Sequence, residues 1–141
     1  MIILDTNIVS ELMKPVPNSE VIAWLDEQEV MELFITTITI AEISYGINVL
    51  PEGKRRSFLD EAFKRAVVEA FKHRTLSFDE SAAHSYGGIM AHRKGLGKPL
   101  SVCDGQIAAI AFSHKAAIAT HNLADFADCS LGLINPFELP A

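Results

Sequence analysis

The chain of 141 residues carries 12 Lys plus Arg against 18 Asp plus Glu, a formal net charge of −6, and 49% of its residues are apolar. This length predicts a single domain, and the apolar content excludes a mainly disordered chain because it is enough to build a core. The apolar run from Met1 to Leu4 meets Asp5 too soon to be a secretory or membrane-spanning segment. We therefore expect a cytosolic protein without a membrane partner.

The predicted elements alternate between strands and helices in chain order. Short apolar or β-branched runs predict strands at residues 2–4, 33–37, 75–78, 116–120 and 131–134. Apolar residues at helical spacing predict helices at 10–13, from 18 through 25, at 39–50, at 56–71, from 79 or 81 onward and at 102–114. This alternation predicts an α/β sandwich around a mostly parallel central sheet, in one domain over residues 1–141.

Charges are distributed unevenly along the chain. Residues 1–53 contain nine acids and one base, whereas residues 54–141 contain nine acids and eleven bases. The bases between Lys54 and Lys98 suit either the phosphates of a nucleic acid or the wetted faces of amphipathic helices. Overall acidity therefore does not exclude a polyanionic substrate.

Four acids occur where the pattern calls for apolar groups. Asp5 closes an apolar strand, and Glu42 is the one charged residue between positions 32 and 52, in a helix expected to be buried on nearly every side. Asp104 shares the sheet-facing side of its predicted helix, and Asp125 follows a small-residue strand. In a parallel sheet, ligands bind beyond the carboxyl ends of the strands, where Asp5 and Asp125 are expected.

Burying several ionised carboxylates without compensation is energetically untenable. Few bases flank Asp5 or Glu42, which leaves protonation, a distant basic side chain or a divalent cation. Oxygen ligands suit a hard ion such as Mg²⁺ or Mn²⁺, which can position a phosphodiester and activate water for its hydrolysis. Each acid alone also has a structural interpretation: Asp5 can cap a helix together with Thr6, and Asp104 can complement a helix dipole.

Other catalytic signatures are absent from the sequence. No H-E-x-x-H metal motif, phosphate-binding G-x-x-x-x-G-K-[ST] loop or G-x-S-x-G nucleophile elbow occurs. Cys103 and Cys129 lack C-x-x-C spacing, so neither a disulfide framework nor a thiolate zinc site is supported.

Around these acids the chain resembles the PIN-domain ribonucleases, specifically the VapC-type toxins of bacterial type II toxin-antitoxin systems. The resemblance spans essentially the whole chain in ordered segments: MIILDTN at 1–7, TTITIAEISYGI at 36–47, KPLSVCDGQIAAIA at 98–111, ATHNLADF at 119–126 and INP at 134–136. It implies a PIN-like nuclease domain that hydrolyses RNA phosphodiester bonds with Mg²⁺ or Mn²⁺. It also implies a homodimer and a cognate antitoxin that inserts a segment near the acidic pocket.

The resemblance implies roles for particular residues. Asp5, Glu42 and Asp104 match the family's catalytic and metal-binding acids, and either Asn122 or Asp125 matches the fourth position. We expect Asp125 to supply the fourth charge. Three residues are expected to support the ligands: Thr6, Thr120 and Asn122. His121 stands where the family often has Arg, and Cys103 where it often has a small residue.

Two other functions fit an acidic pocket. A phosphotransfer domain of the receiver type would need one nucleophilic Asp facing a Lys, yet Lys115 precedes the late strand instead of following it. A non-catalytic binding module would keep the PIN-like fold alone. Magnesium-dependent RNA cleavage that is lost with EDTA would distinguish the nuclease from both.

Overall fold

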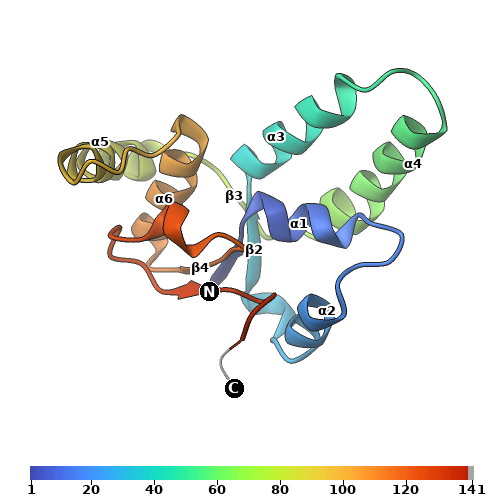
Figure 1. Cartoon of the computed structure of the whole chain (residues 1–141), viewed down its shortest axis with the longest axis horizontal. Coiled ribbons are helices and arrows are strands. Elements are labelled where there is room, and N and C mark those ends of the chain that lie inside the picture. Colours follow the sequence, from blue (N-terminus) through green and yellow to red (C-terminus); the bar gives the residue numbers. More distant parts are fainter. Residues whose placement is uncertain (140–141) are drawn as a thin grey trace.

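A parallel β-sheet runs through the middle of the molecule (Figure 1). The computed structural model describes residues 1–139. The last two residues of the predicted domain, 140–141, lie outside the described residues. Within residues 1–139 the sheet has five strands in the order β3-β2-β1-β4-β5, and every neighbouring pair is parallel. The strands are β1 (Ile2–Leu4), β2 (Leu33–Thr36), β3 (Thr75–Leu76), β4 (Ala117–Ala119) and β5 (Leu133–Ile134).

Helices cover both faces of this sheet (Figure 1). One side carries α1 (Thr6–Leu12), α2 (Ser19–Asp26), α3 (Thr37–Asn48) and α4 (Lys54–Phe63). The other side carries α5 (Glu80–Gly95) and α6 (Val102–His114). Each layer packs a separate apolar cluster against the strands, so the predicted α/β sandwich is confirmed. Among residues 1–139, no helix combines the length and apolar character needed to cross a bilayer.

Polar residues at strand and loop ends begin several helices. Asp5, Asn18, Thr36 and Ser101 each accept a hydrogen bond from a backbone N–H in the first turn of the next helix. Such caps satisfy donors that a helix start leaves free. Asp5 therefore does have the capping role that its sequence context predicted, and α1 begins at Thr6 instead of at residue 10.

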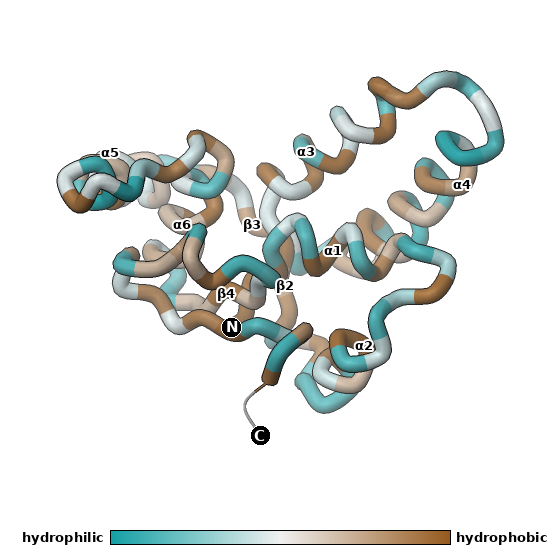
Figure 2. The backbone as a smooth tube through the Cα atoms, in the orientation of Figure 1, coloured by the Kyte–Doolittle hydropathy of each residue, from teal (hydrophilic) through white to brown (hydrophobic). Residues whose placement is uncertain are grey.

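The helix predicted over residues 56–71 is not one α-helix. α4 ends at Phe63 and continues as a π-helical segment, η2 (Lys64–Glu69). Phe63, Val67 and Phe71 are all buried in the same cluster. The three residues thus face the core on both sides of the change in helical geometry. Figure 2 shows the hydrophilic connection that precedes α4, at the end farthest from the sheet.

The expectation that the Glu42 helix is buried on nearly every side is wrong. α3 buries Ile43 and Ile47, but Tyr45 is 72% exposed and Val49 is 60% exposed. α3 contacts α1, α4, α6 and β2, yet the face that carries Tyr45 stays open although the helix is rich in apolar residues. Apolar composition alone therefore could not define its surroundings.

Candidate active site

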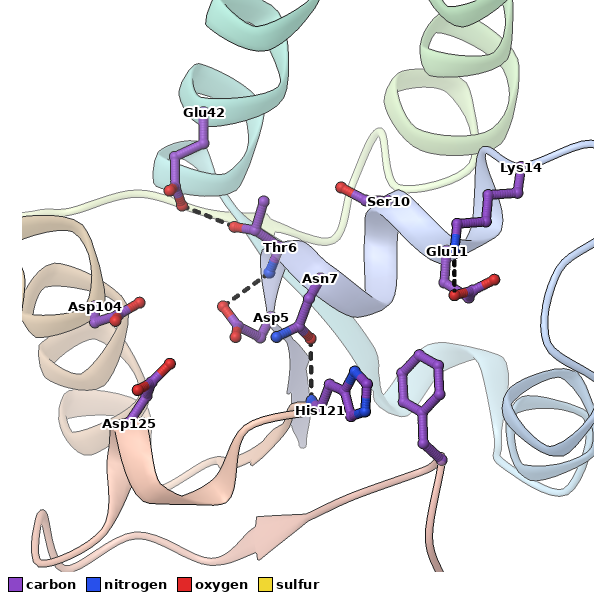
Figure 3. A pocket seen from close by; sticks show the side chains of 11 residues that line it. Asp5, Thr6, Asn7, Ser10, Glu11, Lys14, Glu42, Asp104, His121 and Asp125 are labelled. Carbon is purple, nitrogen blue, oxygen red and sulfur yellow. Dashed lines mark hydrogen bonds and ion pairs between the residues drawn. The ribbon is translucent and has the colours of Figure 1, made fainter.

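The four predicted acids line one cavity of about 470 Å³ at the carboxyl-end edge of the sheet (Figure 3). Asp5 follows the central strand β1, Glu42 projects from α3, and Asp104 lies in the first turn of α6. Asp125 comes from a short 3-10 helix, η3 (Leu123–Phe126), after β4. In the sheet, β1 lies between β2, the next strand in the sequence, and β4, so the strand order reverses between β1 and β4. Open α/β sheets bind ligands at the carboxyl ends of strands where the order reverses in this way.

Asp5 is the most enclosed of these acids, with only 5% of its surface exposed. Its Oδ1 accepts a hydrogen bond from the Thr6 backbone N–H at 2.8 Å, and its Oδ2 accepts one from the Thr120 hydroxyl at 2.9 Å. Burial raises the pKa of Asp5 to about 6, although both hydrogen bonds favour the charged form. The carboxyl is therefore held in one orientation in an environment that penalises its charge.

Glu42 is held by the helix that follows Asp5. The Thr6 hydroxyl donates to Glu42 Oε1 at 2.8 Å and also lies 3.0 Å from the Thr39 hydroxyl. Thr6 thus contacts Asp5 through its backbone and Glu42 through its side chain. Thr6 and Thr120 both hydrogen-bond the carboxylates, as the resemblance implied.

Asp104 and Asp125 form the opposite wall of the cavity (Figure 3). Burial raises the pKa of Asp104, and the nearby carboxylates of Asp125 and Glu42 raise it further, while the charge of Arg93 opposes this. Asp125 is half-buried and faces the cavity. Asn122 is exposed, and its backbone N–H donates to the Thr120 hydroxyl at 3.1 Å. Of the two residues considered for the fourth position, Asp125 is the one that lines the cavity.

Negative charge dominates the cavity wall. Five carboxyl groups line it against one ammonium group, that of Lys14. Lys14 is paired with Glu11 at 2.9 Å, on the side of the cavity away from Asp104 and Asp125 (Figure 3). Within residues 1–139, no Lys or Arg nitrogen lies within 4.0 Å of a carboxylate oxygen of the four predicted acids. Repulsion among these carboxylates is therefore not offset by a direct ion pair, and the charge of Arg93 opposes it only at longer range.

The donor set fits a hard divalent cation in its chemistry. All four side chains offer carboxylate oxygens, the ligands that Mg²⁺ and Mn²⁺ prefer, and Asp5 lies in an enclosed site where a cation would favour its charged form. In their present rotamers, however, no three His, Cys, Asp or Glu side chains of the described part of the chain converge closely enough to hold a metal ion. Metal binding would therefore require other side-chain rotamers of these acids.

Several lining residues were missed in the sequence, namely Asn7, Ser10, Glu11, Lys14, His121 and Phe137. Asn7 Oδ1 accepts from the His121 backbone N–H at 3.1 Å, which joins the end of β1 to the end of β4. The His121 and Phe137 rings stack with centroids 4.0 Å apart. Two of them carried a sequence signal, because Asn7 directly follows Asp5 and Thr6 and His121 stands where the family often has Arg.

The basic residues between 54 and 98 do not all form wetted helix faces or a phosphate-binding patch. Arg93 is 4% exposed and donates to backbone carbonyls, and Arg74 donates to carbonyls of residues 30, 33 and 70. Lys64 and Arg65 pair with acids one helical turn away. These four bases therefore make contacts within the protein, so they are not simply free to bind a phosphate.

Comparisons with known proteins agree with this architecture. The family model described as PIN domain matches residues 2–129. The chain belongs to the PIN-domain family. VapC ribonuclease Y4jK of Sinorhizobium fredii is 41% identical over 138 residues, covering 98% of this chain and 99% of that protein. Toxin FitB of Neisseria gonorrhoeae is 36% identical with the same coverage.

Solved structures support the same family assignment. The structure described as FitAcB from Neisseria gonorrhoeae matches with a TM-score of 0.89 and 37% identity, covering 99% of this chain and all of that one. The structure of FitAB bound to an IR36 DNA fragment matches with a TM-score of 0.91 and 36% identity, over 100% and 99% of the two chains. The family predicted from the sequence, PIN domain of VapC type, is confirmed.

The position of the lysines disfavours the phosphotransfer domain of the receiver type that was considered as an alternative function. Lys115 ends α6 and precedes β4, so it lies at the amino end of the sheet, opposite the edge that carries Asp5. Lys14, the one lysine that lines the cavity, is bound to Glu11. No lysine of residues 1–139 is thus paired with Asp5 as a receiver site would require.

Proposed function

We propose that this protein is the toxin of a toxin-antitoxin pair and acts as an Mg²⁺- or Mn²⁺-dependent endoribonuclease in the cytosol. The observation that carries this proposal is the shared cavity, into which four distant segments deliver carboxylates that lack a basic partner among the described residues. The name VapC ribonuclease of a relative 41% identical to this chain supports the reaction, and the name toxin of FitB supports the biological role.

In this proposal, Asp5, Glu42, Asp104 and Asp125 hold the cation. When bound, the cation lowers the pKa of water and offsets charge that develops on the scissile phosphate. The chain itself supplies orientation: Thr120 and the Thr6 backbone fix both oxygens of Asp5, and the Thr6 hydroxyl fixes Glu42. Without a cation, the five carboxyl groups of the cavity would repel an RNA phosphate.

The proposed protein partner is an antitoxin that inserts a segment beside the acids. A second, more apolar cavity of about 260 Å³ lies between α1, α3 and α4 and shares Thr6, Ser10 and Glu42 with the acidic one. An amphipathic helix could place apolar side chains there while a basic side chain reaches the carboxylates. We also propose the homodimer that the family resemblance implies, which light scattering of the purified protein tests.

Cleavage of labelled single-stranded RNA by the purified protein tests the proposed reaction. We expect cleavage with Mg²⁺ or Mn²⁺, none with EDTA, and recovery when excess metal is restored. Asp5→Asn should reduce the rate at least 100-fold, because it removes a charged ligand while keeping the shape of the side chain.

Glu69→Gln is the matched control, since it removes one negative charge from an exposed side chain outside the cavity. It should cleave at the wild-type rate. Equal cleavage by wild type and Asp5→Asn would contradict the proposed site, and cleavage that persists in EDTA would contradict the proposed cofactor. A folded protein that cuts no RNA under any of these conditions would favour a non-catalytic binding module.

A further inference from the structure

The segment that carries Asp125 has little regular structure of its own. η3 is a single 3-10 turn, and the following residues Asp128 and Ser130 adopt left-handed backbone angles with φ of 61° and 59°. Such a segment depends on contacts with other elements for its position. Phe126, which is 1% exposed, anchors it on the apolar side.

The polar anchor of this segment is Arg93, which projects from α5. Its Nη1 donates to the carbonyl oxygens of Asp125 at 3.1 Å and of Ala127 at 2.8 Å. Its Nε donates to the carbonyl of Lys98 at 2.7 Å. Lys98 lies in the short connection between α5 and α6, just before the turn that carries Asp104. One guanidinium group therefore links the segments that position the third and fourth acids.

Arg93 is an unusual residue for this place. It is 4% exposed, and within residues 1–139 it forms no ion pair with a carboxylate. Burying a cation without an anionic partner is costly, whereas an apolar residue of similar size would only need to fill space. A planar guanidinium donates in fixed directions from three separate nitrogen atoms, whereas a lysine donates from a single rotatable ammonium group and an apolar side chain does not donate at all.

We propose that Arg93 is a positioning residue that holds Asp104 and Asp125 at the separation needed to share one cation. This inference rests on the proposed function, because it assumes that the two acids act together. Arg93 acts through the backbone of Asp125 and of Lys98 and does not line the cavity.

Mn²⁺ affinity, measured by titration calorimetry below the melting temperature, tests this role without relying on RNA cleavage. Arg93→Lys keeps the charge but loses the branched donors, so we expect Mn²⁺ to bind about tenfold more weakly, as for other residues that orient metal ligands. Lys98→Ala is the matched control, because it breaks the exposed 3.7 Å ion pair of Lys98 with Asp128 and so cuts a surface link between the same segments. It should bind Mn²⁺ as wild type does.

A double-mutant cycle with Asp125→Asn separates positioning from general destabilisation. If Arg93 acts through Asp125, adding Arg93→Lys to Asp125→Asn should cause little further loss of Mn²⁺ affinity. Equal losses in the two backgrounds, or a wild-type affinity in Arg93→Lys, would overturn the inference alone. A wild-type protein that binds no Mn²⁺ would overturn the proposed function and this inference together. If Arg93→Lys does not fold, Arg93→Gln replaces it in the same cycle.

Discussion

Replacing the most enclosed carboxyl group of the cavity should stabilise the metal-free protein. Burial raises the pKa of Asp5 from 3.8 to about 6, so at pH 8 the folded protein must hold a buried negative charge that the unfolded chain holds in water. The folded state binds the extra proton between these two values. The contribution of Asp5 to stability is therefore complete below pH 3.8 and is lost as the pH rises through 6.

The size of this effect follows from the shift. About two pKa units correspond to about 3 kcal/mol of unfolding free energy at pH 8. Asp5→Asn removes this penalty, but its amide would face the Thr120 hydroxyl with a donor where Asp5 Oδ2 now accepts. Loss of that hydrogen bond costs about 1 kcal/mol. We expect a net gain of about 2 kcal/mol at pH 8 and no gain at pH 4.

Urea unfolding in EDTA measures this difference, with fluorescence of the single tryptophan, the buried Trp24, as the probe. The free energy of Asp5→Asn minus that of wild type should rise by about 2 kcal/mol from pH 4 to pH 8, since other titrating groups cancel in the difference. Asp26→Asn, at an exposed position, should give a difference that does not vary with pH. A flat profile for Asp5→Asn would refute the electrostatic reasoning.

Three further outcomes are expected. Saturating Mn²⁺ at one hundred times its Kd should stabilise wild type by about 2.7 kcal/mol in thermal melts at pH 8, and Asp5→Asn by much less; equal stabilisation would argue against Asp5 as a ligand. Thr120→Val, at a buried position, should lower the unfolding free energy by about 1–3 kcal/mol in urea, because Asp5 Oδ2 loses its donor. Glu42→Gln keeps an acceptor for the Thr6 hydroxyl, so its melting temperature should stay near wild type while RNA cleavage falls at least 100-fold.

The sequence predicts well those features that depend on neighbouring residues. Apolar runs located the ends of all five strands of the described chain to within two residues, and Asp5 could be placed at a strand end because it directly follows one. Glu42 and Asp104 could be singled out because each interrupts an otherwise apolar helix. The family resemblance then predicted that these acids belong to one metal-binding site.

Features that depend on distant contacts could not be predicted in this way. The π-helical segment after Phe63 has no signature in the apolar spacing, and the open face of α3 depends on which elements pack against it. The position of Asp125 depends on Arg93, a residue that sequence reasoning assigned to a wetted face or a phosphate patch. Spacing along the chain contains no record of these long-range hydrogen bonds.

The order of the cavity walls along the polypeptide has a consequence for synthesis. The central strand β1 is made before the other strands, yet its partner β4 and the last of the four carboxylates, Asp125, come long after it in the sequence. Because ribosomes synthesise a protein from its amino terminus, a nascent chain contains Asp5 and Glu42 long before it contains β4 and Asp125. A chain interrupted before β4 would thus lack this wall, and whatever chemistry the cavity performs begins only after Asp125 has been synthesised.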